Sequence, residues 1–118
     1  MPAEKNFENR VKKWIKSVGG WYVKYWAGGA FTSSGIPDLL SCIKGRFVAI
    51  EVKADDGEPS ELQIWTVSQI RKAGGVAVIL YPKAFDEFRT WAMGGFKTDK
   101  PIIMKGGQYD SRTDCEGE

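Results

Sequence analysis

The stretch "GIPDLLSCIKGRFVAIEVK", residues 35–53, decides the fold of this chain. Its two apolar parts, 38–44 and 46–53, are rich in aliphatic and β-branched side chains, which predicts two β-strands. Only Gly45 separates them, so a tight turn there would fold the two strands into an antiparallel hairpin. The hairpin nevertheless carries acids and a lysine near its strand ends, where an unpaired buried charge would be costly.

Asp38, Glu51 and Lys53 are predicted to meet at one end of this hairpin. Successive residues of a strand point to opposite faces. One face of the second strand should therefore carry Val48, Ile50 and Val52, and the other Phe47, Ala49, Glu51 and Lys53. A turn at Gly45 brings Asp38, at the start of the first strand, close to the end of the second.

Two interpretations of this charged cluster are open. Asp38, Glu51 and Lys53 could form an ordinary ion pair at exposed strand ends. Alternatively, the two carboxylates bind Mg²⁺, which prefers hard oxygen ligands, while the lysine orients a water or stabilises charge on a phosphate. We favour the metal site, because Gly-Ile-Pro at 35–37 fixes the chain before Asp38 and the strand is otherwise apolar. Such a site suits metal-assisted phosphodiester hydrolysis.

The segments around the hairpin predict a small α/β domain. Hydrophobic periodicity and strand-forming runs predict a helix at 4–18, a strand at 21–26, a helix at 60–73, a strand at 76–81, a helix at 83–93 and a short strand at 101–104. Ser60 is a suitable N-cap, and Gln63 would complete a capping box. The strand at 76–81 should lie parallel to the strand at 46–53. The order α-β-β-β-α-β-α predicts a mixed sheet flanked by helices, with a flexible loop at 27–35.

Composition excludes several classes of function. The chain has 118 residues, a formal net charge of +2 and no histidine, which removes histidine-based triads and makes a zinc site unfavourable. Its two cysteines, Cys42 and Cys115, predict a reducing compartment rather than a disulfide framework. The sequence shows no signal-peptide core or membrane span, so we expect a soluble, cytoplasmic protein with no membrane partner.

Positive charge is concentrated in the first half of the chain. Residues 1–53 hold nine Lys/Arg against four Asp/Glu, whereas residues 54–118 hold eight against eleven. A basic face could contact the phosphates of a nucleic acid, although a solvated helix face explains part of it equally well. The residues expected to contact DNA are Arg10, Lys12, Lys13, Lys16, Lys24, Lys44 and Arg46.

The spacing from Asp38 to Glu51-Val52-Lys53, with Pro37 before it, resembles the motif of the PD-(D/E)xK nuclease superfamily. The segments "GIPDLL", "FVAIEVK", "SELQ" and "AGGVAVIL" are similar to its VRR-NUC branch, the virus-type replication-repair nucleases. The resemblance implies a restriction-endonuclease-like core, here a nuclease domain over 1–93 and a partly disordered C-terminal extension over 94–118. A viral origin would place the protein in the host cytoplasm.

The resemblance also implies the parts of an active site. A metal, Mg²⁺ with Mn²⁺ as a substitute, would be held by Asp38, Glu51 and the backbone carbonyl of Val52, with Lys53 as the catalytic lysine. The first helix would add an acid, for which we favour Glu8 over Glu4 because the helix end can fray. Gln63 matches a family position near the active site and could also serve the capping box.

The expected function is a Mg²⁺-dependent, structure-specific DNA endonuclease of repair and recombination, similar to a Holliday-junction resolvase. Flap, nicking or restriction-like specificities are alternatives, as are an RNA substrate and a nuclease fold kept as a DNA-binding module. Paired cuts in branched DNA would need two sites, so we expect a homodimer. The rich aromatic content predicts that apolar surface from 83–104 contributes to its interface.

Overall fold

The computed structural model describes residues 2–26 and 35–106. Most of the predicted loop (27–34), and the end of the chain that was predicted to be disordered (107–118, with Cys115), lie outside the described residues. The described elements are α1 (Pro2–Ser17), β1 (Trp21–Lys24), β2 (Leu39–Ile43), β3 (Arg46–Val52), α2 (Glu61–Lys72), β4 (Val76–Leu80), a 3-10 turn (Pro82–Ala84), α3 (Phe85–Met93) and β5 (Ile103–Met104). The predicted order of helices and strands is therefore confirmed.

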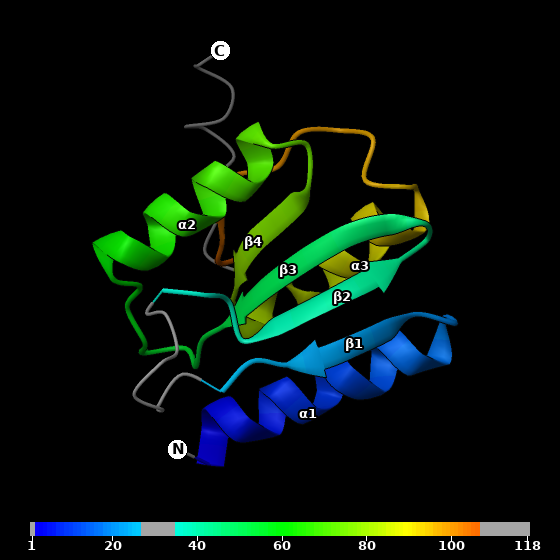
Figure 1. The fold of residues 1–118 in the computed structure, drawn as a ribbon. Coiled ribbons are helices and arrows are strands. Elements are labelled where there is room, and N and C mark those ends of the chain that lie inside the picture. Colours follow the sequence, from blue (N-terminus) through cyan, green and yellow to red (C-terminus); the bar gives the residue numbers. More distant parts are fainter. Residues whose placement is uncertain (1, 27–34, 107–118) are drawn as a thin grey trace, which may run out of the picture.

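The strands form one five-stranded sheet in the order β1-β2-β3-β4-β5. β2 pairs antiparallel with β1 and β3, whereas β4 pairs parallel with β3 and β5. The sheet is mixed and flanked by helices, as the sequence predicted (Figure 1). Because β5 adds the last strand, residues 103–104 of the predicted C-terminal extension belong to the same sheet as the rest of the domain.

The central hairpin turns over two residues. Ile43 pairs with Arg46, and the two residues between them have positive φ angles, 54° at Lys44 and 79° at Gly45. Two consecutive positive φ angles are the mark of a type I′ turn, whose twist matches that of the two strands. Gly45 takes this conformation without steric cost. The tight turn fixes the register that sets Leu39 opposite Ile50 and so aligns the strand ends.

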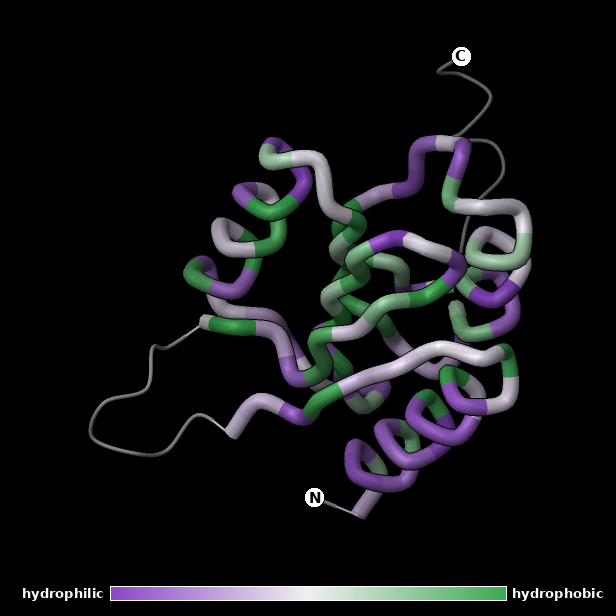
Figure 2. Tube along the Cα trace, turned by 45° about the vertical axis from the view of Figure 1, so that its right-hand side comes forward, coloured by the Kyte–Doolittle hydropathy of each residue, from purple (hydrophilic) through white to green (hydrophobic). Residues whose placement is uncertain are grey.

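Helices cover the two faces of the sheet (Figure 1). On one face α1 and α3 pack against inward side chains of the strands, including Val48, Ile50 and Val52. On the other face α2 packs through Val67 against Ala49 and its neighbours on β4. The predicted alternation of the two faces of β3 is confirmed. Figure 2 shows the hydrophobic segments gathered in the central strands and a largely hydrophilic α1 at the periphery.

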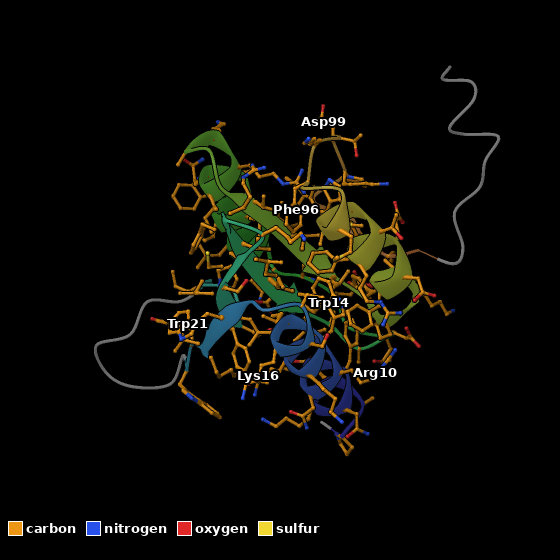
Figure 3. The ribbon with its side chains drawn as sticks, turned by 90° about the vertical axis from the view of Figure 1, so that its right-hand side faces the viewer. Arg10, Trp14, Lys16, Trp21, Phe96 and Asp99 are labelled. Carbon is orange, nitrogen blue, oxygen red and sulfur yellow. The ribbon has the colours of Figure 1, made fainter. Side chains whose placement is uncertain are left out.

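The C-terminal aromatic side chains lie inside the domain rather than on its surface. Phe85, Phe88, Trp91 and Phe96 are buried, and Trp14 of α1 packs edge-on against Phe85 and Phe88. Figure 3 labels Trp14 and Phe96 of this group. The aromatic side chains of the helix at 83–93 are therefore not available for an interface, because they pack inside the same chain; the contribution of residues 83–104 to a homodimer stays a prediction. Among the described residues, the large apolar side chains that are exposed are Trp21, Val23, Trp26, Phe47, Leu62, Trp65 and Met93.

Candidate active site

Asp38 is held in place at the start of β2 by contacts on both its backbone and its side chain. Its carboxylate oxygen Oδ2 accepts a hydrogen bond from the backbone N–H of Val52 at 2.9 Å, and its own carbonyl accepts one from Tyr25 at 2.8 Å. The approach to Asp38 needs a glycine: Gly35 has a φ of +81°, and a Cβ there would lie 2.6 Å from Cγ of Leu62 on α2. Asp38 is therefore fixed beside the end of β3, as predicted.

Glu51 lies near the same end of β3 and is almost fully buried, with 4% of its surface exposed. Its Oε2 accepts a hydrogen bond from Gln63 Nε2 at 2.9 Å, and the ammonium of Lys53 lies 3.5 Å from the same oxygen. Gln63 also closes the capping box of α2 with Ser60, so its predicted capping role is confirmed, while its predicted role in the active site stays a prediction. The capping box thus aims one side chain of α2 at the acid of β3.

The surroundings of Glu51 disfavour its charged form. Burial, joined by the negative charge of Asp38, raises the pKa of Glu51 from 4.5 to about 7, and the neighbouring Lys53 only partly opposes this rise. An acid with a pKa near neutrality marks a place where negative charge is incompletely balanced by the protein. Such a site gains free energy when a cation arrives.

Glu8, the acid of α1 that the sequence favoured, lies near Asp38. It is 3% exposed, and its Oε1 accepts a hydrogen bond from Lys24 at 2.8 Å. The ammonium of Lys12 lies 2.9 Å from the other oxygen, Oε2, close enough for an ion pair although no described donor meets that oxygen with hydrogen-bond geometry. Burial alone would raise the pKa of Glu8, but the hydrogen bond from Lys24 and the positive charges of Lys24 and Lys12 hold it below its ordinary value.

Lys24 connects the first helix to the Asp38 side of the site. Besides Glu8, its ammonium contacts Oδ1 of Asp38 at 3.4 Å, and its side chain is 18% exposed. Burial would lower the pKa of Lys24, but Glu8 and Asp38 raise it above the usual value. Glu4, the alternative acid of α1, is half-buried, and its charge adds slightly to the raised pKa of Glu51.

The basic residues predicted to contact DNA differ in their partners and in their exposure. Lys12 and Lys24 are paired with Glu8, and Arg46 donates to the carbonyl of Gly95 at 3.1 Å. The others are exposed: Arg10, Lys13, Lys16 and Lys44. Arg10 and Lys16 both extend from α1 (Figure 3), so α1 is the main element on which free positive charge remains available for phosphates.

The donor set at the strand ends is suited to a hard divalent cation. Asp38 and Glu51 supply carboxylates. The N–H of Val52 points to Asp38, and the N–H and C=O of one strand residue point to the same side of the strand, so the Val52 carbonyl also faces the Asp38 side. Among residues 2–26 and 35–106, no group of three or more Asp, Glu, Cys or His side chains is arranged to hold a metal. Two carboxylates and a carbonyl match Mg²⁺, which keeps several of its waters.

The sequence did not predict that Lys24 contacts both Glu8 and Asp38. Its strand pattern offered a signal, because Tyr22 packs inward and Lys24, two residues later, must point to the same face. An inward lysine at a strand end needs an acid partner. That partner comes from α1, and the sequence alone does not specify how a helix and a strand join.

Comparisons with protein-family models, with curated proteins and with solved structures find no match to this chain. Among the described helices, none combines the length and the apolar composition needed to cross a membrane.

Proposed function

We propose that this protein is a Mg²⁺-dependent DNA endonuclease with a PD-(D/E)xK core of the VRR-NUC type. The observation that carries the proposal is the convergence of Asp38, Glu51 and Lys53 at the ends of β2 and β3, with Glu51 buried and its pKa raised to about 7. A simple surface ion pair would leave a carboxylate with a normal or lowered pKa. Two carboxylates beside a lysine, one of them buried with a raised pKa, support a cation site used for chemistry on phosphates.

The residues of the site divide the work of phosphodiester hydrolysis. Mg²⁺, when bound, supplies a Lewis acid that polarises the phosphate and lowers the pKa of the attacking water. Asp38 and Glu51 would hold it together with the Val52 carbonyl, since Asp38 is already hydrogen-bonded to the N–H of Val52. Lys53 does not hold the metal, and its ammonium would orient the water and stabilise charge on the phosphate.

Gln63 acts as a positioning residue in this proposal. Its amide N–H donates a hydrogen bond to Oε2 of Glu51, which fixes the orientation of the carboxylate. The raised pKa of Glu51 has other causes, namely burial and the charge of Asp38. Its amide oxygen meanwhile accepts from the N–H of Ser60, so the start of α2 and the end of β3 are tied through one side chain. A rigidly held carboxylate costs less reorganisation when a metal binds.

The substrate is proposed to be branched DNA recognised by its shape. The free positive charge of α1, with Arg10, Lys13 and Lys16, can contact phosphates, which position a protein on DNA without reading sequence. Four-way junctions, flaps, nicked and linear duplexes, and an RNA duplex, each end-labelled and incubated with Mg²⁺ or with EDTA, test this proposal. Preferred cutting of the junction supports branched DNA as the substrate. Preferred cutting of a flap or of RNA would identify that molecule as the substrate instead. Binding without cutting would support a DNA-binding module.

Paired cuts in a junction need two active sites, so we propose a homodimer. The buried aromatic side chains of α3 do not supply its interface, and the interface must use other exposed surface. Light scattering of the free protein and of its junction complex measures the assembly. A monomer in both states would exclude paired cutting and favour a nicking or flap nuclease.

A further inference from the structure

The ammonium of Lys24 occupies a position between two acids that come from different elements. It lies 2.8 Å from Oε1 of Glu8 on α1 and 3.4 Å from Oδ1 of Asp38 at the start of β2. Both acids belong to the proposed site, and Lys24 itself is largely buried. A positive charge shared by two carboxylates in this way fills the place where a cation bound by both acids would sit.

We propose that Lys24 is a tethered cation that occupies the Glu8–Asp38 position in the metal-free protein and must leave Asp38 when a divalent cation binds. Lys24 would then be a positioning residue that sets the metal affinity of the site. The inference rests on the proposed function and adds to it a residue that competes with the metal. It also assigns to Lys24 a role different from the phosphate contact expected from the sequence.

Charge repulsion makes the two states exclusive. An ammonium and a divalent cation at neighbouring oxygens of Asp38 would repel each other strongly in a partly buried site. Glu8, which is 3% exposed, needs a positive partner in both states, because an unpaired buried carboxylate is costly. Lys12 can supply that partner, since it lies 2.9 Å from Oε2 of Glu8, whereas Lys24 uses Oε1.

The displaced ammonium has an attractive surface close at hand. The ring centroid of Trp26 lies 5.4 Å from Nζ of Lys24, and the ring is exposed. An ammonium over the face of a tryptophan is stabilised by the ring electrons. A small movement of the Lys24 side chain toward Trp26 would therefore release Asp38 without leaving the lysine in an apolar environment.

Variants at Lys24 and Lys12 separate competition from a general effect of charge. The probe is MnCl₂, titrated into metal-free protein while the free ion is followed by electron paramagnetic resonance, with no DNA present. If Lys24 bridges the acids in about 90% of molecules, it weakens the apparent affinity about tenfold, so Lys24→Met should bind Mn²⁺ about tenfold more tightly than wild type. Lys12→Met, which removes the same charge from the same Glu8, should change the affinity much less.

Lys24→Arg gives a second test in the opposite direction. Its guanidinium can bridge two carboxylates with a fixed fork of donors, so this variant should bind Mn²⁺ more weakly than wild type and should fold even if Lys24→Met does not. Equal tightening in Lys12→Met and Lys24→Met, or Mn²⁺ binding by Lys24→Arg as tight as wild type, overturns the role of Lys24. If the role of Lys24 is overturned in this way but the wild-type protein still cleaves DNA with Mg²⁺, the proposed function stands. Wild type that neither binds Mn²⁺ nor cleaves DNA overturns both.

Discussion

Replacing Glu51 with glutamine should stabilise the metal-free protein at neutral and alkaline pH. Glu51 is buried, and its pKa is raised from 4.5 to about 7 by burial and by Asp38. A carboxyl whose pKa is higher in the folded state binds protons more tightly when folded, so its contribution to stability falls as pH rises from about 4.5 to about 7. At about 1.4 kcal/mol per pH unit, the full penalty above pH 7 is about 3 kcal/mol.

The glutamine retains most of the contacts that the carboxylate makes. An amide oxygen can still accept the hydrogen bond from Gln63, and the attraction of Lys53 for the carboxylate is already included in the raised pKa. We therefore expect Glu51→Gln to be more stable than wild type by about 3 kcal/mol at pH 8, and by much less at pH 5. Because the chain has no histidine, few other groups change charge between these two pH values.

Urea denaturation in EDTA at pH 5 and pH 8 measures this difference. A gain of about 3 kcal/mol corresponds to a midpoint about 1.5 M higher in urea. Asp56→Asn is a suitable control, because it removes one negative charge from an exposed position of the nearby loop. Adding Mg²⁺ at pH 8 should stabilise wild type more than Glu51→Gln. If Glu51→Gln is less stable than wild type in EDTA at pH 8, the account of Glu51 as an incompletely balanced acid is refuted.

Three further predictions test the roles of the individual site residues. Asp38→Asn should lower cleavage of labelled DNA at least about a hundredfold, while gel-shift binding survives; near-normal turnover would remove Asp38 from the metal site. Lys53→Ala should abolish turnover but keep the Mg²⁺-dependent rise in melting temperature, and Lys53→Arg should not restore cleavage; loss of that rise would make Lys53 part of the metal site. Ser60→Ala and Gln63→Ala each break the capping box, so each should lower the free energy of unfolding in urea by about 1 kcal/mol. Only Gln63→Ala also removes the hydrogen bond to Glu51, so only this variant should slow cleavage. Equal cleavage rates in both variants would leave Gln63 with the capping role alone.

Local sequence patterns specified most of the sheet. The turn at Gly45, the alternation of the two faces of β3 and the capping box of Ser60 and Gln63 depend on neighbouring residues, and all three are present in the structure. The same alternation placed Glu51 and Lys53 on one face, and the hairpin register brought Asp38 to their end of the sheet. Short-range geometry was sufficient for these features.

The features that the sequence did not specify depend on how distant elements meet. The aromatic stripe of α3 was interpreted as an interface because a stripe indicates burial but not the surface that buries it; Trp14 of α1 is its partner. The contact of Lys24 with Glu8 likewise joins a strand to a helix 16 positions earlier in the chain. Helix packing against the sheet determines both contacts, and no local pattern encodes the angle at which α1 lies.

The central claim is that Asp38, Glu51 and Lys53 catalyse attack of water on a DNA phosphate with Mg²⁺. Cleavage of a four-way junction in ¹⁸O-labelled water, followed by mass spectrometry of the products, tests it most directly. The account predicts strand breaks with Mg²⁺ and not with EDTA, each carrying one labelled oxygen on the new terminal phosphate, and none with Asp38→Asn. Intact junction after incubation of folded wild type with Mg²⁺, or breaks whose terminal phosphates carry no label, would contradict the account.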